Sequence, residues 1–485
     1  MKLSEILNNI DPISVAADGE TEITDVVNDS RAVTPGSLFV AVRGFETDGH
    51  RYIPQAVAQG AAAVVCEEEP AVPVPYILVK NSRKALARSA CRFFGDPSSK
   101  MTVIGVTGTN GKTTTTYLVK HLLEEVLGAK VGLIGTNGNM IGSELLHSER
   151  TTPESRDLQA LLAQMAQAGC THVVMEVSSH ALDLDRVDSV HYHVGMFTNL
   201  TQDHLDYHKT MENYAAAKAK LFTMCAKGVV NRDDPWADEM LAQAACPVLT
   251  YGVKDGGADL TARDIRYSAA GVHFTAVYGG EQVPVSLAIP GTFSVYNALG
   301  VLACMLQLGI SLTEAAAAMA TATGVKGRVE VVPTDGDYTI LIDYAHTPDA
   351  LENVLTSMRA VTNGRLVALF GCGGDRDRTK RPLMGRIAAE CADFVVVTSD
   401  NPRTEEPEAI IQEILAGMEH TSTPRQVIVN RPEAIAWAIE HHQPGDVIVL
   451  AGKGHEDYQI IGKTKIHMDE REIVAEILKR RRERK

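Results

Sequence analysis

A glycine-rich loop between an apolar strand and a helix is the feature that most constrains what this chain can fold into. The apolar run 101–106 indicates the strand, and residues 114–127 have a helical pattern. Between them stands Gly108-Thr109-Asn110-Gly111-Lys112-Thr113-Thr114. Backbone N–H groups of such a loop, together with the N-terminus of the following helix, bind phosphate oxygens. We therefore expect an ATP-binding α/β domain built on a doubly wound, mainly parallel sheet.

Two side chains of the loop suit the chemistry of a bound nucleotide. Lys112 would reach the outer phosphates, and the Thr113 hydroxyl would bind Mg²⁺. The match to the general phosphate-loop pattern is incomplete, because Val106 stands where that pattern has its first glycine. The loop predicts nucleotide binding but does not identify the reaction, since kinases, motors, GTPases and ligases all use it.

Composition excludes several classes of protein. The net charge of −15 over 485 residues argues against nucleic acid or an anionic membrane as the main partner. The eight cysteines form no C-x-x-C pair, which fits a reducing compartment better than a disulfide framework. No apolar run reaches the roughly 18 residues of a membrane span, and the N-terminus lacks a signal pattern. We expect a cytoplasmic protein.

The order of apolar runs and turns predicts three domains, with boundaries at residues 1–98, 99–328 and 329–485. A turn cluster at 95–99 follows a predicted helix at 82–94 and separates the first two. Residues 259–289 read as a small antiparallel patch, and the third domain alternates strands with helices in a Rossmann-like order. The predicted strands are 37–42, 62–66, 101–106, 131–134, 172–177, 194–199, 338–343, 366–370, 394–398 and 447–451.

Polar residues follow several of these strands, where parallel sheets bind ligands. Glu176 ends one strand, and strand-end carboxylates of nucleotide enzymes commonly hold Mg²⁺. His204 lies in the loop after the next strand, on the same predicted sheet edge. His191 and His193 alternate along a strand, and we expect them to be packing residues and not metal ligands. Lys218, in a helical stretch, reads from the sequence alone as an ordinary helix lysine.

Taken together, these motifs resemble those of the Mur ligase family, ATP-dependent amide-forming enzymes of peptidoglycan precursor synthesis. The resemblance extends over essentially the whole chain. It is carried by residues 108–114, Glu176-Val177-Ser178-Ser179-His180, Thr198-Asn199-Leu200, Asp203-His204-Leu205-Asp206, Lys218, Tyr296-Asn297, Gly327-Arg328 and Asp343-Tyr344-Ala345-His346-Thr347-Pro348. The shorter glycine loop, with Val106 before it, fits the form seen in this family.

The resemblance implies roles for individual residues in the central part of the chain. It implies that Lys112, Glu176, His204 and Lys218 are catalytic, with Lys218 carbamylated by CO₂ to an anionic oxygen ligand. Thr113, Glu176, His204 and the modified Lys218 would then hold Mg²⁺. ATP would be bound by Gly108, Thr109, Asn110, Gly111, Lys112, Thr113, Thr114, Asn297, Arg328 and Asp343.

Within the family, three stretches resemble the members that add 2,6-diaminopimelate to a UDP-muramoyl dipeptide: Asn28-Asp29-Ser30-Arg31, residues 373–384 and residues 400–407. The resemblance assigns the UDP-muramoyl dipeptide to Ser30, Thr151, Thr152, Ser178 and Arg186. It assigns meso-diaminopimelate to Arg376, Asp400, Asn401, Pro402, Arg403, Gly452 and Glu456. The chain departs from some relatives at Leu184, where they carry glutamine, and at Phe45-Glu46-Thr47, where they carry His-Gln-Ala.

The implied reaction has two steps. The D-glutamyl γ-carboxylate attacks the γ-phosphorus of ATP, and an amine then displaces phosphate from the acyl phosphate. A bidentate arginine suits the second carboxylate of diaminopimelate, which lysine lacks, and Arg376 and Arg403 supply such forks. We expect a monomer. The alternatives are the same reaction with L-lysine, a folylpolyglutamate-synthase-like ligase, a plain phosphotransferase and a nucleotide sensor without turnover.

Overall fold

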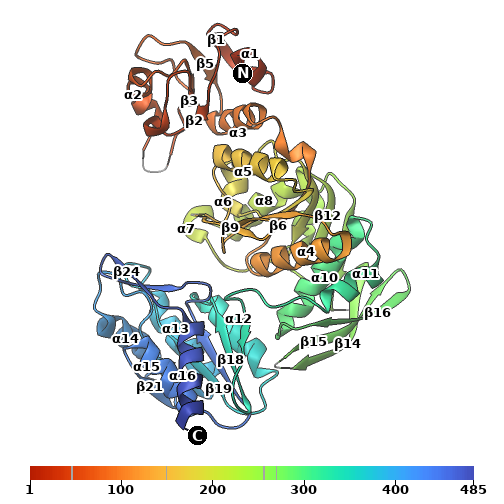
Figure 1. The fold of residues 1–485 in the computed structure, drawn as a ribbon, viewed down its shortest axis with the longest axis vertical. Helices are drawn as coiled ribbons and strands as arrows, with labels where there is room; N and C mark the ends of the chain where they lie inside the picture. The colour runs from red at the N-terminus through yellow and green to blue at the C-terminus, as the bar shows by residue number, and fades with distance from the viewer. Residues whose placement is uncertain (45–46, 149, 255–256, 269, 485) are drawn as a thin grey trace. The chain divides into compact units, whose positions relative to one another are not determined.

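The computed structural model describes residues 1–44, 47–148, 150–254, 257–268 and 270–484. The chain forms two compact units (Figure 1). The first unit contains residues 1–250 and 303–309, and the second contains residues 251–302 and 310–485. Within the described residues, no helix combines the length and the apolar character needed to cross a bilayer.

The N-terminal part of the first unit is a five-stranded sheet with helices on both faces. The strand order is β1-β5-β4-β3-β2, and β2 to β5 are parallel. Leu86 of α3 packs on one face with Leu38 and Val65, and Ile53 of α2 packs on the other with Phe39 and Val64. The elements are α1 (Leu3–Leu7), β1 (Pro12–Ala16), β2 (Val26–Val27), η1 (Ser30–Ala32), β3 (Leu38–Val40), η2 (Gly49–Tyr52), α2 (Ile53–Ala58), β4 (Ala63–Cys66), β5 (Tyr76–Val79), α3 (Ser82–Phe93) and η3 (Pro97–Lys100).

A second sheet of the first unit carries the glycine loop. Its central strands β12, β11, β6, β10 and β7 are neighbours in that order, and the pairs β12–β11, β11–β6, β6–β10 and β10–β7 are parallel. The elements are β6 (Thr102–Thr107), α4 (Lys112–Leu127), β7 (Val131–Ile134), β8 (Asn139–Ile141), β9 (Glu144–Leu146), α5 (Ser155–Gln167), β10 (His172–Glu176), α6 (Ser179–Asp183), β11 (Tyr192–Phe197), α7 (Leu205–His208), α8 (Met211–Ala219), η4 (Lys220–Thr223), β12 (Cys225–Asn231), α9 (Ala237–Gln243) and β13 (Val248–Gly252).

Helices cover both faces of this second sheet. Helix α4 packs against β6, β7 and β10. Leu158 and Leu162 of α5 pack with Val103 and Met175 in a buried cluster that also contains Tyr214 of α8. Because the central strands are parallel, their carboxyl ends share one edge. The loops that follow β6, β10 and β11 start at that edge and hold the predicted phosphate loop, Ser178 and His204.

The second unit begins with an antiparallel arrangement. Strand β13 crosses the unit boundary, and its residue Tyr251 pairs with Leu260 of β14. Strands β14, β15 and β16 then form an antiparallel meander, with a register irregularity between Arg263 and Arg266. The elements are β14 (Leu260–Ser268), β15 (Gly271–Tyr278), β16 (Glu281–Leu287), α10 (Thr292–Gln307) and α11 (Leu312–Met319), and residues 303–307 of α10 belong to the first unit.

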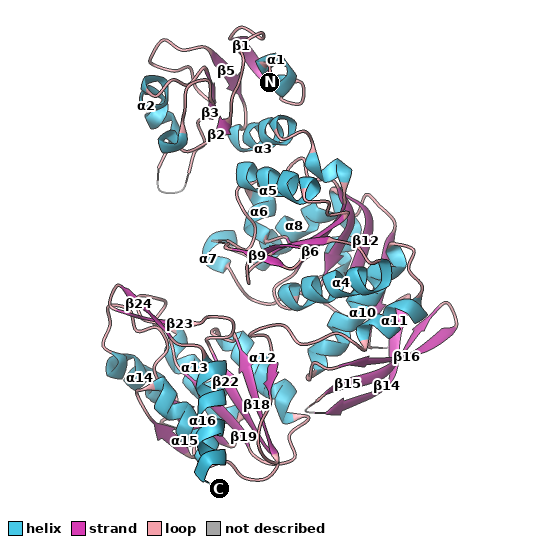
Figure 2. Ribbon diagram, in the orientation of Figure 1, coloured by secondary structure: helices cyan, strands magenta, loops and turns pink. Residues whose placement is uncertain are grey.

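The C-terminal part of the second unit is a six-stranded sheet in the order β17-β18-β22-β19-β20-β21, parallel except for β17. Figure 2 shows its strands in magenta among helices. The elements are β17 (Glu330–Val332), β18 (Tyr338–Asp343), α12 (Pro348–Arg359), β19 (Leu366–Phe370), α13 (Lys380–Cys391), β20 (Phe394–Val397), α14 (Pro407–Ala416), β21 (Arg425–Val427), α15 (Arg431–Glu440), β22 (Asp446–Ala451), β23 (Tyr458–Ile461), β24 (Thr464–His467) and α16 (Glu470–Arg484).

Alternate residues of these strands face two separate cores. Leu341 and Val449 pack in one buried cluster with residues of α12, α13 and α14, whereas Ile340 and Ile448 pack in another with residues of α15 and α16. This alternation is the period of two expected of a strand covered on both faces. The predicted α/β class and doubly wound, Rossmann-like arrangement are therefore confirmed.

Most predicted elements lie where the apolar runs indicated. Strands 131–134, 338–343 and 366–370 match β7, β18 and β19 at both ends, and the antiparallel strands of residues 259–289 are present. The predicted helix after the glycine loop begins two residues earlier, at Lys112, because Gly111 in the left-handed region already serves as its N-cap. The three domain boundaries stay a prediction.

Candidate functional site

The glycine loop is shaped by two residues that need glycine. Gly108 has φ +148° and Gly111 has φ +83°, both in the region that disfavours side chains. A Cβ on Gly108 would overlap Thr198 Oγ1 and lie 3.1 Å from Asn199 O. The loop after β11 therefore packs directly against the backbone of the glycine loop, and any side chain at Gly108 would force the two apart.

Hydrogen bonds join these two loops. Thr109 N donates to Asn199 O at 2.8 Å, and Asn110 N donates to Asn199 Oδ1 at 2.9 Å. In return, Thr198 Oγ1 donates to Asn110 O at 2.7 Å and Thr201 N donates to Thr109 Oγ1 at 3.0 Å. The loop is thus held in one shape by neighbouring protein groups, which preorganises it for phosphate.

Two lysines converge on the glycine loop. Lys112 Nζ donates to Gly108 O at 2.9 Å and to Thr109 O at 2.8 Å. Lys218 Nζ, from α8, donates to the same Gly108 O at 2.8 Å. The two amines thus lie close together, and the charge of Lys112 makes this point electropositive, which favours an anionic ligand there.

Lys218 is not the ordinary helix lysine that the sequence alone suggests. Its side chain is 1 % exposed and lies 4.6 Å from the centroid of the Tyr214 ring. Burial, followed by the charge of Lys112, lowers the pKa of Lys218 well below its ordinary value. A lysine with a lowered pKa is more often an uncharged amine, the form that attacks CO₂ to give a carbamate.

Glu176 is buried at the end of β10, so it is not a solvent-facing glutamate. Its Oε1 accepts from Thr136 N at 3.0 Å, and its Oε2 accepts from Thr136 Oγ1 at 3.1 Å. Gly135 allows this approach, because a Cβ there would lie 2.5 Å from Glu176 Oε1. Thr136 is a site residue that the sequence reasoning missed.

His204 lies in the left-handed region, with φ +52°, and forms the N-cap residue of α7. Its Nε2 lies 3.3 Å from Asp203 Oδ2. Burial lowers the pKa of His204, the Asp203 charge opposes this, and the Lys112 and Lys218 charges lower the pKa further. The His204 ring lies 6.2 Å from the Tyr214 ring, whose hydroxyl lies 3.2 Å from Thr109 Oγ1, so His204 is near the glycine loop.

The prediction that His191 and His193 are packing residues is wrong. Both side chains are exposed, and His191 Nε2 lies 3.6 Å from Asp96 Oδ1. Strand β11 begins only at Tyr192, so His191 precedes it. Alternation along the strand therefore put Tyr192 and Val194 in the core and left the two histidines on the outer side.

Four residues assigned to the UDP-muramoyl dipeptide lie near the end of β10. Thr152 Oγ1 donates to Glu176 O at 2.9 Å and accepts from Ser178 N at 3.1 Å, and Arg186 Nη1 lies 3.5 Å from Thr152 O. Thr151 Oγ1 lies 3.0 Å from Thr136 Oγ1, which contacts Glu176. These contacts make Thr151, Thr152, Ser178 and Arg186 one connected group.

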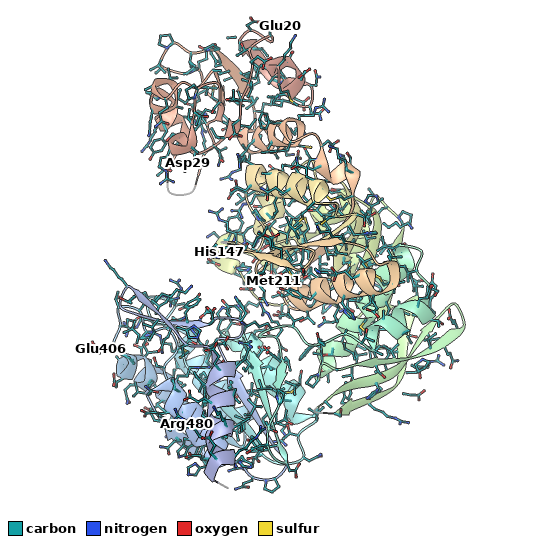
Figure 3. The ribbon with its side chains drawn as sticks, viewed as in Figure 1. Glu20, Asp29, His147, Met211, Glu406 and Arg480 are labelled. Carbon is teal, nitrogen blue, oxygen red and sulfur yellow. The ribbon has the colours of Figure 1, made fainter. Side chains whose placement is uncertain are left out.

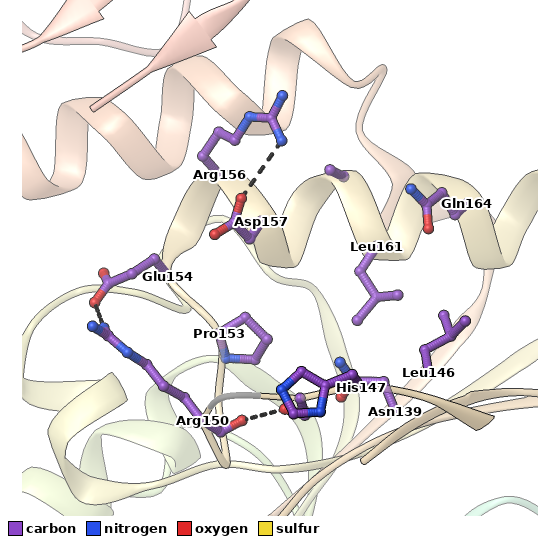
Figure 4. A pocket seen from close by; sticks show the side chains of 12 residues that line it. Asn139, Leu146, His147, Arg150, Pro153, Glu154, Arg156, Asp157, Leu161 and Gln164 are labelled. Carbon is purple, nitrogen blue, oxygen red and sulfur yellow. Dashed lines mark hydrogen bonds and ion pairs between the residues drawn. The ribbon is translucent and has the colours of Figure 1, made fainter. Parts of the chain in front are cut away.

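Arg186 is mostly buried, and burial lowers its pKa despite the opposing Glu154 charge at 2.8 Å. Glu154 also pairs with Arg150, and the pair lines a cavity of about 440 Å³ beside the same loop (Figure 4). His147, labelled in Figures 3 and 4, also lines this cavity. Polar side chains thus surround the segment that carries Thr151 and Thr152.

Ser30, the remaining predicted contact to this substrate, and the positions that depart from some relatives lie elsewhere. Ser30 is buried in η1 and its Oγ donates to Gln55 Oε1 at 3.1 Å. Leu184 is the C-cap residue of α6, and its N–H donates to His180 O at 2.8 Å. Phe45 and Glu46 lie outside the described residues.

In the second unit, Asp343 is buried, and the half-buried Arg328 acts on it through its charge. Asp343 accepts from Val329 N and from Ala345 N, both at 2.8 Å. Burial raises the pKa of Asp343, and the Arg328 charge opposes that rise. The Arg328 guanidinium lies 5.0 Å from the centroid of the Tyr344 ring. Asn297, the third residue assigned to ATP in this unit, is buried on α10.

The residues assigned to diaminopimelate come together at the carboxyl ends of β20 and β22. Asp400 Oδ1 accepts from Asn401 N at 2.7 Å, whereas Asp400 Oδ2 is buried without a hydrogen-bond partner. A Cβ on Gly452, which has φ +112°, would lie 2.9 Å from Asp400 Oδ2. Pro402 is buried, and its carbonyl packs against Gly374, where a side chain would overlap it.

Arg403 has φ +52°, a conformation held by two hydrogen bonds to β23 and the turn after it. Arg403 N donates to Ile460 O at 3.1 Å, and Gly462 N donates to Arg403 O at 2.7 Å. Its guanidinium donates to Gly374 O at 2.9 Å. Arg376 is exposed and donates to Asp375 O at 3.0 Å. A Cβ on Gly373 would lie 3.0 Å from Arg403 Nη1 and 3.7 Å from Arg376 Cγ.

A fully buried arginine joins the loops that carry Arg376 and Arg403. Arg381 donates to both carboxylate oxygens of Glu405, at 2.8 and 2.9 Å, to Glu413 at 2.8 Å, and to Gly373 O at 3.2 Å. Arg381 lies within residues 373–384, one of the three stretches that carry the resemblance. Its fixed fork positions both loops at once.

Glu456, the last of the predicted amino-acid contacts, is paired inside the protein. Its Oε2 accepts from Asn401 Nδ2 at 2.9 Å and from Lys453 Nζ at 2.7 Å. The sequence reasoning missed Lys453, although it stands between the two predicted contacts Gly452 and Glu456. A lysine between two glycines after a buried strand was the available signal.

The first unit fits a nucleoside triphosphate with a hard cation. The close approach possible at Gly108, the N-terminus of α4 and the Lys112 amine suit phosphate, and the Glu176 carboxylate and Thr113 hydroxyl are oxygen donors suited to Mg²⁺. The described residues bring together no group of three or more His, Cys, Asp or Glu that could hold a metal. Carbamylation of Lys218 would add a further oxygen ligand to the Glu176 carboxylate and the Thr113 hydroxyl.

Three segments of the chain match Mur ligase family models. Residues 22–94 match the model described as "Mur ligase family, catalytic domain". Residues 106–305 match "Mur ligase middle domain", and residues 327–454 match "Mur ligase, glutamate ligase domain". The matched segments together span most of the chain.

Curated relatives of the same length support this match. The chain is 47% identical over 483 residues to the UDP-N-acetylmuramoyl-L-alanyl-D-glutamate–2,6-diaminopimelate ligase of Caldanaerobacter subterraneus subsp. tengcongensis, covering 99% of each chain. It is 45% identical over 483 residues to the ligase of the same name from Clostridioides difficile, again covering 99% of each. A solved structure of an enzyme of that name matches with a TM-score of 0.76 at 34% identity, covering 99% of both chains.

Proposed function

The chain belongs to the Mur ligase family, and we propose that it joins meso-2,6-diaminopimelate to the D-glutamyl γ-carboxylate of UDP-N-acetylmuramoyl-L-alanyl-D-glutamate at the expense of ATP. It is an ATP-dependent amide ligase of peptidoglycan precursor synthesis. The observation that carries the choice of amino acid is the cluster of Asp400, Asn401, Arg403 and Glu456 in the second unit.

This cluster suits an amino acid with charges at both ends. Arg403 and the exposed Arg376 flank Gly373 and offer guanidinium forks for a carboxylate. Glu456 and the buried, unpaired Asp400 Oδ2 suit an ammonium group. Diaminopimelate has a second carboxylate for an arginine fork, and L-lysine has none. A site with two arginines therefore favours diaminopimelate.

The first unit supplies the phosphoryl-transfer half of the reaction. Lys112 would leave its contacts with Gly108 O and Thr109 O to neutralise charge on the transferring phosphoryl group. Thr151, Thr152, Ser178 and Arg186 would hold the dipeptide next to Glu176, so that its γ-carboxylate faces the phosphate loop. The acyl phosphate formed there is then attacked by the amine of diaminopimelate.

Mg²⁺ would be held by Thr113, Glu176, His204 and carbamylated Lys218, and would stabilise negative charge on the phosphates. The low pKa of Lys218 supports the carbamate, because the uncharged amine is the nucleophile toward CO₂. Asn297, Arg328 and Asp343 would bind the adenine, phosphate and ribose of ATP.

We assign the three functions to residues 1–98 for the UDP-sugar, 99–328 for ATP and 329–485 for the amino acid. The matched family segments 22–94, 106–305 and 327–454 support this division. We further propose that the enzyme acts as a cytoplasmic monomer without a nucleic-acid partner, which fits its net charge of −15.

The substrate assignment is tested by phosphate release. The protein is incubated with ATP, Mg²⁺, the UDP-muramoyl dipeptide and one amino acid at a time. We expect the fastest turnover with meso-diaminopimelate and little release without an amine. Faster turnover with L-lysine would overturn the assignment, and release that needs no amine would favour a plain phosphotransferase.

The carbamate is tested by ¹³C nuclear magnetic resonance. Protein equilibrated with ¹³C-bicarbonate should show a carbamate resonance that is absent from the Lys218→Met variant. A spectrum of active wild-type enzyme without this resonance would remove Lys218 from the metal-binding set, while leaving the substrate assignment untouched.

A further inference from the structure

Three side chains at the edge of the amino-acid cluster form a closed ring of hydrogen bonds. Lys453 Nζ donates to Asn401 Oδ1 at 3.0 Å and to Glu456 Oε2 at 2.7 Å. Asn401 Nδ2 donates to the same Glu456 Oε2 at 2.9 Å. Each member therefore contacts the other two, although Asn401 is separated from Lys453 by 52 positions in the sequence.

Lys453 is completely buried, with 0 % of its surface exposed, and its ammonium lies 5.1 Å from the centroid of the Tyr458 ring. A buried ammonium is costly unless it is paired and hydrogen-bonded. Here the Glu456 carboxylate supplies the countercharge, the Asn401 oxygen supplies a second acceptor, and the aromatic face adds a further favourable contact.

The ring also fixes which way the Asn401 amide points. Asn401 Oδ1 accepts from Lys453 Nζ and from Ile460 N, the latter at 2.9 Å. Two donors on one side require the oxygen there, so the amide NH₂ must face Glu456. Lys453 thus determines the orientation of Asn401 and, through it and directly, the position of the Glu456 carboxylate.

We propose that Lys453 is a positioning residue for the amine substrate, which holds Asn401 and Glu456 in the geometry that receives the substrate's charged end group. Glu456 Oε2 accepts both hydrogen bonds. They restrict rotation of the carboxylate and so set the direction in which Oε1 points. The inference rests on the proposed function, because Asn401 and Glu456 are assigned there to diaminopimelate.

Loss of Lys453 should leave Asn401 Oδ1 with only the Ile460 N–H as donor and Glu456 Oε2 with only the Asn401 amide, so both side chains are held less firmly. Glu456 would keep its carboxylate but lose its countercharge and its fixed position. The expected loss is therefore in binding of the amino acid, with little change in the phosphoryl-transfer half of the reaction, which lies in the first unit. A residue needed only for folding would affect all three substrates alike.

The test compares Lys453→Met with the wild-type enzyme in the full reaction. We expect the KM for meso-diaminopimelate to rise about 10- to 100-fold, the range for loss of a charged hydrogen bond. The KM values for ATP and for the UDP-muramoyl dipeptide should stay within about twofold. Lys465→Met is the matched control, because the Lys465 ammonium lies over the same Tyr458 ring, at 3.5 Å, but on exposed strand β24.

A double variant keeps the test decisive if Lys453→Met fails to fold. Lys453→Met combined with Glu456→Gln removes both charges, so no carboxylate is left buried and unpaired. If Lys453 acts through Glu456, the double variant should have the same KM for the amino acid as Glu456→Gln alone, within about threefold. Equal rises in all three KM values, an unchanged KM for the amino acid, or additive effects in the double variant would each overturn the proposal.

The experiment also separates this inference from the proposed function. The wild-type enzyme is first assayed with diaminopimelate and with L-lysine. If lysine proves the better substrate, the substrate assignment fails, and the KM shift of Lys453→Met is then measured with lysine. A shift confined to the amine would still support the positioning role.

Discussion

The phosphate loop in the first unit and the amino-acid cluster in the second are built on opposite principles. In residues 108–114 the backbone determines the shape of the site. Loop amides and carbonyls are hydrogen-bonded to residues 198–201, and two lysine amines donate to a single carbonyl oxygen. At Asn401, Lys453 and Glu456 the structure comes from side chains whose charges already balance one another.

The difference corresponds to what each site must recognise. A triphosphate offers many negative oxygens in similar positions, so a rigid backbone loop with surplus positive charge is sufficient. An amino acid with particular charged ends must be distinguished from others, and that requires individually placed side chains. We therefore expect damage to the first site to reduce kcat and damage to the second to change KM and selectivity.

The strongest test of this contrast is Lys112→Met. The substitution removes the charge that would neutralise the transferring phosphoryl group, and we expect kcat to fall about 10³-fold with the KM for diaminopimelate little changed. Steady-state phosphate release measures both constants. Lys130→Met is the control, because Lys130 also donates to a backbone carbonyl, Ala168 O at 2.8 Å, but is exposed. A main effect on the KM for the amino acid would break the contrast.

An intermediate effect is expected from Arg403→Lys. Lysine keeps the charge but loses the planar fork, so we expect kcat/KM for diaminopimelate to fall about 10- to 100-fold while activity with L-lysine changes less. The ratio of the two activities measures selectivity. Arg425→Lys serves as control, since Arg425 also donates to a carbonyl, Met418 O at 3.3 Å, from an exposed position in the same unit. Equal losses with both amino acids would show that Arg403 does not read the second carboxylate.

The sequence predicted the phosphate loop, which is shaped by backbone, more completely than the amino-acid cluster, which is formed by side chains. Apolar runs and glycines are local signals, so β7, β18 and β19 were predicted to the residue, and the loop before α4 was recognised. The burial of Lys218 was not, because its periodicity is that of any helix. The only local hint was the run of small residues Ala215-Ala216-Ala217 before it, which permits close packing.

For the same reason, the sequence could not predict contacts between residues that are far apart along the chain. The partners of Lys453, Arg381 and Glu176 depend on how separate strands and loops are brought together. Thr136 contacts Glu176 across 40 positions, and Arg381 contacts Glu405 across 24. The resemblance predicted which positions act together, and the geometry gives the contacts that hold each of them in place.

The smallest expected effect concerns the ion pairs that support the amino-acid cluster. The Arg381 guanidinium lowers the pKa of Glu405 from its ordinary value of 4.5 to about 2. Because the folded-state pKa is the lower one, this carboxylate stabilises the fold above pH 4.5, and the contribution is lost as the pH falls toward 2. The amino-acid cluster should therefore lose stability below pH 4.5, before the phosphate loop does.

Glu405→Gln tests this by removing the titrating group. We expect the variant to have a lower Tm than wild type at pH 6, and the difference to shrink steadily as the pH is lowered from about 5 toward 3. Glu406→Gln, at the exposed neighbouring position labelled in Figure 3, should track the wild type throughout. A difference in Tm that is independent of pH would mean that Glu405 contributes through neutral hydrogen bonds. Charge pairing would then not be what distinguishes the amino-acid cluster from the phosphate loop.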